Sequence, residues 1–511
     1  MACGTRSKCC TNVLVLLTFI AFSLLIAGII VAALGSFTTL VDDEIKKNLP
    51  LKEGSTSFDK WKDSDGEQLI KYFFFNITDT GNSTTVPRLK EFGPYTYKKT
   101  VTTNVTKRLG QTLTFFTITR YNFDKSRSCA GCDPFKDRFT TVNYPLLALL
   151  RGVGARLQLQ NASTAQIRAL QTASLLQSTG VGLFRERSVQ EYLWGYKDTA
   201  LGTVFQQLTR QLIPGNIFPG VQSNNSEGYV TKIHTGESDV NRVTEVLEWR
   251  NYTKLPFWNS DSSNMINGTN GRRFKPFLEK HDTLNAFIKE ICRSLRISYD
   301  SSTSVRDIDL YRYIVRKEEL LNGNVNPNNK GFCVTGPTKA CLPTGLLDVM
   351  NCRGGSTGTP FIASTPHFYD GDPKLSELFD LKPDKEKHGT YVAVEPNTGI
   401  TMQGHLRLQL NFPVSKSQDI PRILLNNVSD ILYIPVFYTD DFAEISEEDA
   451  DDFKTNVLLP KLIAEAMPYV MIGLGALLLL IAVVILIVCR SSRAAQAELS
   501  GSGGKDNFSM K

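Results

Sequence analysis

The sequence predicts a mixed α+β protein in which one large folded domain lies between two membrane-spanning helices. Three observations support this prediction: an uncharged apolar run near each end of the 511-residue chain, several segments rich in aromatic and β-branched residues, and one long Leu/Ala/Gln/Arg-rich stretch with helical spacing. The content of 41% hydrophobic and 10% aromatic residues excludes a disordered chain. The chain therefore has enough apolar residues for a large core in addition to its two apolar runs.

The two apolar runs comprise residues 13–34 and 469–489. A helix rises ~1.5 Å per residue, so each run is long enough to cross a hydrocarbon core of ~30 Å. The first run is also longer than the apolar core of a cleaved signal peptide. We therefore expect a transmembrane helix at residues 13–34 and another at residues 469–489.

Basic residues flank both runs on the side of the chain ends. Arg6 and Lys8 precede the first run, and Arg490 and Arg493 follow the second. The positive-inside rule places the short tails, residues 1–12 and 490–511, in the cytosol, and residues 35–468 on the extracellular or lumenal side. The net charge of +6 is mild and much of it lies in these tails, which argues against a nucleic-acid-binding domain.

Glycosylation signals and cysteines support an exoplasmic location for the large domain. Asn-x-Ser/Thr acceptor sites between the two runs occur at Asn76, Asn82, Asn104, Asn161, Asn224, Asn251, Asn267 and Asn427. The same segment contains Cys129, Cys132, Cys292, Cys333, Cys341 and Cys352, which an oxidising compartment would pair as disulfides. The residues alone leave most of the pairing open. For Cys129 and Cys132, which sit in a turn, a local disulfide is favoured over a catalytic redox pair.

The other four cysteines lie at the predicted cytosolic face of the membrane. They are Cys3, Cys9, Cys10 and Cys489. Reversible S-acylation is the favoured interpretation, and reduced thiols near a bilayer are the alternative.

Strand patterns occur on both sides of the helix-rich stretch. Strands are expected at residues 69–78, 96–105, 112–123, 229–236, 307–315, 390–396, 405–414 and 431–439. About three helices are expected over residues 145–213, together with a short helix at residues 40–47. Ser446 begins another helix, with acidic residues in its first turn, that runs toward the second apolar run.

Motifs that would indicate catalysis or metal binding are incomplete. Ser356 lies in a G-x-S-x-G sequence, but the strand and helix that a nucleophile elbow requires do not flank it. His367 has Asp370 and Asp372 nearby, and residues 63–67 resemble part of a calcium loop, but both patterns are typical of solvated turns. We therefore expect a protein that is not an enzyme and that has no catalytic residues, no metal and no cofactor.

The helix-rich stretch is distinctly basic. Its arginines include Arg151, Arg156, Arg168, Arg185 and Arg187. Such a surface would suit anionic amphiphilic ligands such as oxidised or acidic lipid particles. Alternatively, the apolar positions pack on one another and the arginines face water. The residues alone leave both interpretations open.

An ordered series of short motifs resembles the class B scavenger receptors, the family of the fatty-acid translocase, the high-density-lipoprotein receptor and the lysosomal integral membrane protein. The matching segments are FGPYTY (92–97), EYLWGYKD (191–198), MINGT (265–269), KPFLEK (275–280), ICRS (291–294), GFC (331–333), TPHF (365–368) and VEPNTG (394–399). The resemblance implies an antiparallel β-barrel-like ectodomain with an internal lipid tunnel and a helical ligand-binding cap at residues 145–213. It also implies disulfides between Cys292 and Cys352 and between Cys333 and Cys341, whereas a Cys129–Cys132 bond lies outside the shared pattern. The loop at residues 178–182 lacks the lysines that other members place there, which puts their acidic ligands in doubt for this chain.

Together these features predict a plasma-membrane receptor with both termini cytosolic. It would bind lipids, fatty acids, sterols or lipoprotein particles at the cap, transfer hydrophobic cargo through the tunnel to the membrane, and accommodate a protein ligand at the cap. No nucleic-acid partner is expected. The alternative is an endosomal or lysosomal receptor for a partner hydrolase, and a two-span ectoenzyme or channel is a more remote one.

Overall fold

The computed structural model describes residues 3–63, 66–79, 86–335, 339–354, 359–415, 420–424 and 431–501. The chain separates into two compact units. One unit comprises Met1–Asn48 together with Ala450–Lys511, and the other comprises Leu49–Asp449. We call them the helical unit and the ectodomain unit.

The helical unit contains the two apolar runs. Its helices are α1 (Cys3–Leu34), α2 (Ser36–Asn48) and α13 (Leu459–Gly501); α13 follows α12 (Glu447–Phe453) and the π-helical turn η9 (Lys454–Leu458). Two helical stretches, Asn12–Leu34 and Glu447–Ser492, are long and apolar enough to cross a membrane. The Ser446 hydroxyl accepts a hydrogen bond from the backbone N–H of Asp449 at 3.0 Å and so caps α12 as predicted.

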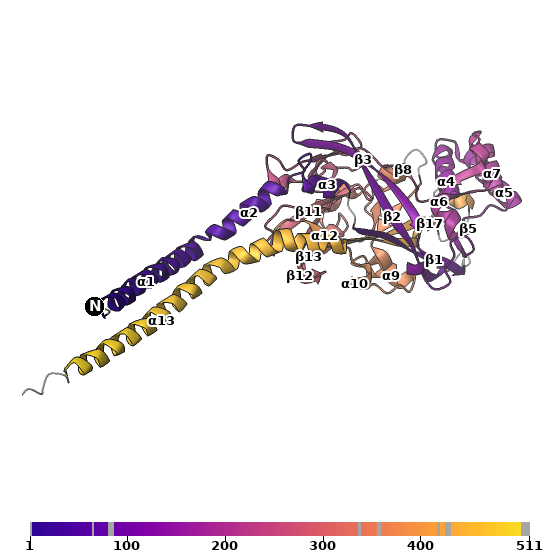
Figure 1. Ribbon diagram of the computed structural model, residues 1–511. Coiled ribbons are helices and arrows are strands. Elements are labelled where there is room, and N and C mark those ends of the chain that lie inside the picture. Colours follow the sequence, from indigo (N-terminus) through magenta and orange to yellow (C-terminus); the bar gives the residue numbers. More distant parts are fainter. Residues whose placement is uncertain are drawn as a thin grey trace, which may run out of the picture. The chain divides into compact units, whose positions relative to one another are not determined.

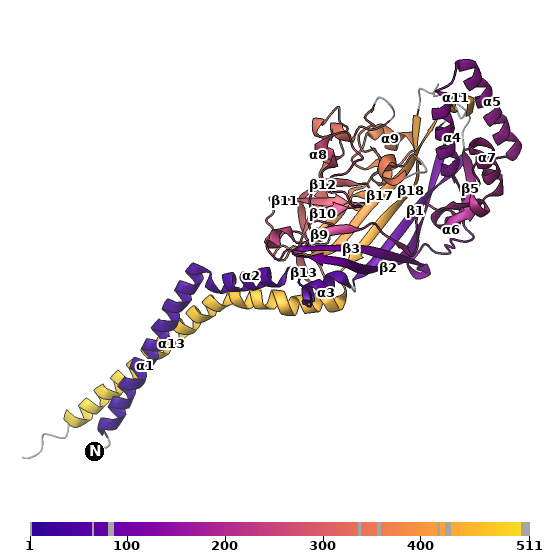
Figure 2. The ribbon, with the colours of Figure 1, turned by 90° about the horizontal axis from the view of Figure 1, so that it is seen from above.

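Helices α1 and α13 lie side by side within the helical unit (Figures 1 and 2). Small residues allow a close approach. A Cβ on Gly28 would lie 3.0 Å from the carbonyl oxygen of Pro468, and a Cβ on Gly475 would lie 2.9 Å from that of Ala21. Close contact of backbones at small residues is the usual way in which membrane helices associate.

A large antiparallel sheet forms the body of the ectodomain unit. Its long strands include β1 (Glu67–Asp79), β2 (Arg88–Leu109), β3 (Thr112–Phe123), β17 (Thr401–Ser415) and β18 (Ile431–Glu444). The strand order along the sheet is β10-β9-β3-β2-β1-β18-β17-β16-β13-β12-β11. Strand β18 lies between β1 and β17, so the last strand of the chain pairs with the first (Figures 1 and 2).

The two ends of this strand order are linked by one short segment. Thr269 bridges Glu245, beside β10, and also Ala286 in β11. The preceding Gly268 has a φ of 92°, and a Cβ there would lie 2.1 Å from the carbonyl oxygen of Asn285. Only glycine fits this close backbone approach. The sheet is therefore a nearly closed barrel, as the resemblance implied.

The remaining strands complete the sheet and two small ribbons. In the sheet they are β8 (Ser226–Glu227), β9 (Thr231–His234), β10 (Val246–Trp249), β11 (Thr283–Ile288), β12 (Arg293–Val305), β13 (Ile308–Val315), β14 (Leu347–Asp348), β15 (Ile362–Ser364) and β16 (Tyr391–Val394). The ribbons pair β4 (Arg138–Val142) with β5 (Phe184–Ser188) and β6 (Gly195–Lys197) with β7 (Ile217–Pro219). Short helices are α3 (Thr56–Lys62), α8 (Asp261–Asn264), α9 (Pro373–Leu378), α10 (Lys385–His388) and α11 (Ile420–Leu424).

The predicted helix-rich stretch contains four helices rather than three. They are α4 (Tyr144–Leu157), α5 (Ala162–Thr179), α6 (Val189–Trp194) and α7 (Thr199–Thr209), and Figure 2 shows α4, α5 and α7 near the ends of the long strands. The stretch also includes strand β5, which the helical spacing obscured because β5 is stabilised by pairing with β4. We call α4–α7 the helical cap.

Alternation along the strands distinguishes the inner face of the barrel. Ile70, Tyr72 and Phe74 on β1 are buried on one face. The opposite face of the sheet carries charged side chains such as Arg312 on β13, which pairs with the exposed Glu386. Because the interior face of a small barrel is the apolar one, the Ile70 face is the inner wall.

Candidate functional site: the barrel interior and the helical cap

Three leucines of β17 point into the barrel but are only half-buried. Leu406, Leu408 and Leu410 stand opposite Asp441, Thr439 and Phe437 of β18, on the same face as Ile70. Inward-facing apolar side chains of a fully packed core would be buried. Their residual accessible surface means that this part of the inner wall is not fully covered by other side chains.

An ion pair also lies on the inner wall. The Nζ atom of Lys99 lies 2.6 Å from Oδ1 and 2.7 Å from Oδ2 of Asp441, and the two side chains are 14% and 26% exposed. Lys99 shares a face with Tyr97 on β2 and stands opposite Tyr121 on β3. Burial opposes the charge of Lys99, but the Asp441 carboxylate outweighs it, so the pKa of Lys99 lies above its ordinary value.

Two tyrosines beside this ion pair have enclosed hydroxyl groups whose polar neighbours are Gln222 for Tyr72 and Trp194 for Tyr97. Tyr72 and Tyr97 are buried, and their rings meet edge to face with centroids 5.8 Å apart. Burial raises the pKa of Tyr97 to about 12. The neighbouring Tyr121 hydroxyl, in contrast, accepts a hydrogen bond from Nε2 of Gln222 at 3.0 Å.

The sequence did not predict this polar cluster. The available signal is the alternation in TYKKTV (96–101), which places Lys99 on the same face as Tyr97. Asp441 follows an apolar strand pattern, so nothing local predicts that it faces inward. The pairing of the two residues depends on the tertiary neighbour relation between β1, β2 and β18.

The helical cap reaches the inner wall through α6. The ring of Trp194 lies 5.4 Å from that of Tyr97 and 5.4 Å from that of Tyr121, and Tyr192 packs against Phe74. A capping box holds the start of α6, in which Ser188 and Glu191 exchange hydrogen bonds. The helical cap therefore packs directly against the inner wall of the barrel.

The outer surface of α4 and α5 combines exposed arginines with exposed apolar residues. Arg151, Arg156 and Arg168 are exposed and form no ion pair in the described part of the chain. Leu159, Ile167 and Leu170 are 87%, 57% and 61% exposed. We call these six residues the cap surface.

The other two arginines of the predicted set are used within the cap. Arg187 pairs with the buried Asp198 and lies over the ring of Tyr196 at 4.0 Å. Arg185 lies 4.0 Å from the same carboxylate and donates to the carbonyl oxygen of Gly180 at 3.0 Å. Asp198 also accepts a hydrogen bond from the N–H of Leu201 and so caps α7.

The described acceptor asparagines differ in exposure. Asn161, Asn224, Asn251 and Asn267 are exposed, and Asn76 and Asn104 are half-buried. Asn82 and Asn427 lie outside the described residues. Asn161 also caps α5, since its side chain accepts a hydrogen bond from the N–H of Thr164 at 2.9 Å.

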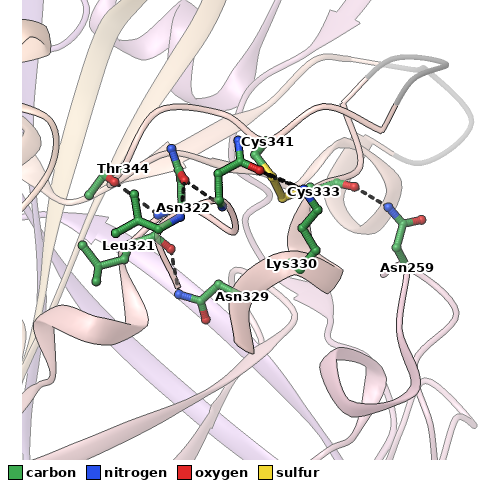
Figure 3. Close-up of a disulfide and its surroundings, with 10 residues drawn as sticks. Asn259, Leu321, Asn322, Asn329, Lys330, Cys333, Cys341 and Thr344 are labelled. Atoms are coloured by element: carbon green, nitrogen blue, oxygen red, sulfur yellow. Dashed lines mark hydrogen bonds between the residues drawn. A yellow bond between two sulfur atoms is a disulfide. The ribbon is translucent and has the colours of Figure 1, made fainter. Parts of the chain in front are cut away.

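The six ectodomain cysteines form three disulfides in the structure. The pairs are Cys129–Cys132, Cys292–Cys352 and Cys333–Cys341. Figure 3 shows the Cys333–Cys341 bond beside a loop held by amide side chains. There Asn329 donates to the carbonyl oxygen of Leu321 at 2.7 Å, and Asn259 donates to that of Cys333.

Among the four predicted acylation sites, only the side chain of Cys489, on α13, lies in the described part of the structure. The side chains of Cys3, Cys9 and Cys10 lie outside it. S-acylation of all four residues stays a prediction.

The motifs that could have indicated catalysis or metal binding are those around His367, residues 63–67 and Ser356. Nε2 of His367 lies 2.7 Å from Glu91, and its ring stacks on that of His388 with centroids 4.1 Å apart. Within the described residues, no group of three or more His, Cys, Asp and Glu could hold a metal ion. Ser356 and part of the 63–67 turn lie outside the described residues.

Comparison with known proteins gives matches over nearly the whole chain. Residues 19–486 match the sequence model of the CD36 family. Lysosome membrane protein 2 of Rattus norvegicus is 32% identical over 458 residues, which cover 88% of this chain and 90% of the relative. Scavenger receptor class B member 1 of Cricetulus griseus is 28% identical over 476 residues, which cover 91% and 89%.

Proposed function

Because the chain belongs to the CD36 family of class B scavenger receptors, we propose that it is a two-pass membrane receptor that transfers lipids. Lipids or lipoprotein particles bind at the helical cap, and hydrophobic cargo moves through the barrel to the bilayer. Both tails are cytosolic in this proposal, and the ectodomain unit is exoplasmic.

The observation that supports transfer most directly is the half-buried state of Leu406, Leu408 and Leu410 on the inner wall. An apolar wall that is not fully covered stabilises an acyl or sterol chain by ~0.8 kcal/mol per buried CH₂. Passage along such a wall requires no covalent step. The receptor therefore acts by offering a continuous apolar surface between cap and membrane.

The cap surface is suited to capture. Exposed leucine and isoleucine side chains lose unfavourable contact with water when they dock on a lipid surface, and the arginines attract anionic head groups. Arg168 is exposed on α5, the same helix that carries the exposed Ile167 and Leu170. A glycan on Asn161 would lie at the start of the same helix and limit the orientation of a bound particle.

Blocking the interior tests the transfer step. In cells that express the full chain, Leu408→Trp should lower uptake of a labelled lipid from lipoprotein several-fold and leave lipoprotein binding unchanged. Asn122→Trp is the matched control, because Asn122 is exposed on the outer face of β3. Undiminished uptake by Leu408→Trp at normal surface abundance would contradict transfer through the barrel.

The second candidate function is that of a lysosomal or endosomal receptor for a partner hydrolase. The observation that favours it is the 32% identity to lysosome membrane protein 2, against 28% to scavenger receptor class B member 1. Microscopy of the untagged protein separates the two locations. Steady-state overlap with a lysosomal marker, with little protein at the cell surface, would favour the second candidate.

A further inference from the structure

An exposed aromatic patch surrounds the tight turn that follows β10. Tyr229 and Tyr252 are 55% and 40% exposed, and Val230 is 37% exposed. Phe257 is half-buried and meets the ring of Tyr252 edge to face, with centroids 6.1 Å apart. Exposed apolar side chains that are grouped mark a contact surface more often than scattered ones do. We call these four residues the aromatic patch.

The turn beside the patch has a tightly defined backbone. Trp249 and Tyr252 exchange both backbone hydrogen bonds, at 3.0 and 2.9 Å, across the two-residue loop formed by Arg250 and Asn251. Both loop residues have a positive φ, 55° and 63°, which is the pattern of a type I′ turn. Asparagine tolerates this backbone well, whereas arginine rarely adopts it, so other contacts compensate at Arg250.

The side chain of Arg250 supplies these contacts. Its guanidinium carbon lies 4.1 Å from the ring centroid of Tyr229 and 5.5 Å from that of Phe257. Its Nη1 atom donates a hydrogen bond to the carbonyl oxygen of Cys352 at 3.0 Å. The cation therefore fixes the turn to the aromatic patch, and the next residue, Asn251, is held at the edge of the patch.

Asn251 is also the acceptor of a glycosylation signal. The signal consists of Asn251, Tyr252 and Thr253, and all three residues are exposed. An N-linked glycan begins with N-acetylglucosamine, whose ring has a face of C–H groups and hydroxyls at its edge. Such a face can pack on an aromatic ring while the hydroxyls stay in water, and tyrosine suits contacts of this mixed kind. The signal therefore places a ligand of matching chemistry beside exposed tyrosines.

We propose that the core sugars of an N-linked glycan on Asn251 pack on Tyr252 and Tyr229 and cover the aromatic patch. This inference rests on the exoplasmic location in the proposed function and assigns a structural role to one glycan. The sugar stabilises the turn and, through Arg250, the segment that carries Cys352. It also removes the patch from contact with lipid particles, which leaves capture to other surfaces such as the cap surface.

Removing the glycan and the tyrosines in combination tests the contact. Thr253→Ala removes the acceptor signal and keeps Asn251. In the full chain in detergent, Tyr252→Ser should lower the unfolding temperature by about 1–2 °C more in the glycosylated protein than in the Thr253→Ala background. Tyr229→Ser should show the same difference, although the loss of its packing on Trp249 destabilises both backgrounds. Equal losses in the two backgrounds would overturn the contact.

Enzymatic release of glycans from the folded protein gives a second readout. Peptide:N-glycosidase F should act several-fold faster at Asn251 in Tyr252→Ser than in the wild-type chain. The glycan on Asn161 is the matched control, because residues 157–168 contain no aromatic residue, and its release rate should not change. Equal release rates at Asn251 with and without Tyr252 would overturn the contact.

Mass spectrometry of the two glycopeptides separates this inference from the proposed function. A glycan on Asn161 with none on Asn251 would overturn the contact and leave the exoplasmic location supported. Absence of a glycan from both asparagines would count against the contact and against the proposed orientation of the chain.

Discussion

At the scale of single residues, the arginines of the cap perform different tasks. Arg187 pairs with buried Asp198, whereas Arg168 is exposed. We expect Arg187→Met to lower the free energy of unfolding by about 2–4 kcal/mol, because it removes the nearer of the two arginines from a buried carboxylate. Arg168→Gln should change stability by less than about 0.5 kcal/mol but weaken binding to vesicles of acidic phospholipid.

Thermal unfolding and vesicle co-sedimentation of the two variants separate these tasks. Equal losses of stability in both variants would show that Arg168 is also structural. Unchanged vesicle binding by Arg168→Gln would remove α5 from the proposed cap surface.

Asn161 combines a glycosylation signal with a helix cap. Ser163→Ala removes the acceptor sequence and keeps the Asn161 side chain, while Asn161→Gln removes both functions. Both variants should lose one glycan by gel mobility. Only Asn161→Gln should in addition lose about 1 kcal/mol of stability, the usual contribution of a cap. Identical unfolding temperatures for the two variants would show that the cap contributes little here.

At the scale of elements, the sequence predicted the two apolar helices and most of the long strands, but not all of them. Residues 112–123 alternate clearly and form β3 at those bounds. Strand β12 was not predicted, because its Ser-rich sequence has weak strand propensity and the strand depends on pairing with β11 and β13. The inward direction of Lys99 and Asp441 was missed for a similar reason: only the barrel closure decides which polar residue faces in.

The contact between α1 and α13 depends on two glycines at which the helix backbones approach closely. Gly28→Leu or Gly475→Leu should separate the two helices, because a Cβ at either glycine already meets backbone of the other helix. Gly473→Leu is the matched control, since a Cβ at Gly473 meets no atom within 4 Å. Cysteine crosslinking between the spans, or thermal stability in detergent, should fall for the first two variants only. Equal crosslinking in all three would contradict the close packing.

At the scale of the whole molecule, the barrel explains why an anchor at each end is possible. Glu67 at the start of β1 pairs with Glu444 at the end of β18. Lys60 and Asp449, near the two ends of the ectodomain unit, form an ion pair at 2.6 Å. The first and last parts of the domain therefore meet, and both chain connections leave it from one place. Such pairing across the whole sequence is favourable only once the intervening chain has folded.

The stability of the ectodomain should fall with acidification because of His388. Burial, and then the neighbouring charge of His367, lower the pKa of His388 to about 4, whereas an unfolded histidine has a pKa of about 6.5. Between these values the unfolded chain binds more protons than the folded one. The stabilising contribution is therefore present above about pH 6.5 and lost progressively toward about pH 4, with a total of up to about 3 kcal/mol. Glu91 acts in the same direction at lower pH: burial opposes its ionisation, but hydrogen bonds from His367 and Tyr438 outweigh it and lower its pKa.

Unfolding of the full chain in detergent at about pH 7.5, 5.5 and 4.5 measures this dependence. His388→Gln should flatten the slope between the first two conditions, whatever its effect on stability at neutral pH, because glutamine does not titrate. His281→Gln is the control, since His281 is exposed and should leave the slope unchanged. A wild-type protein equally stable at the first two conditions would contradict the role of His388. The result also bears on location, because a lysosomal resident must function inside the pH range in which this stabilisation is already declining.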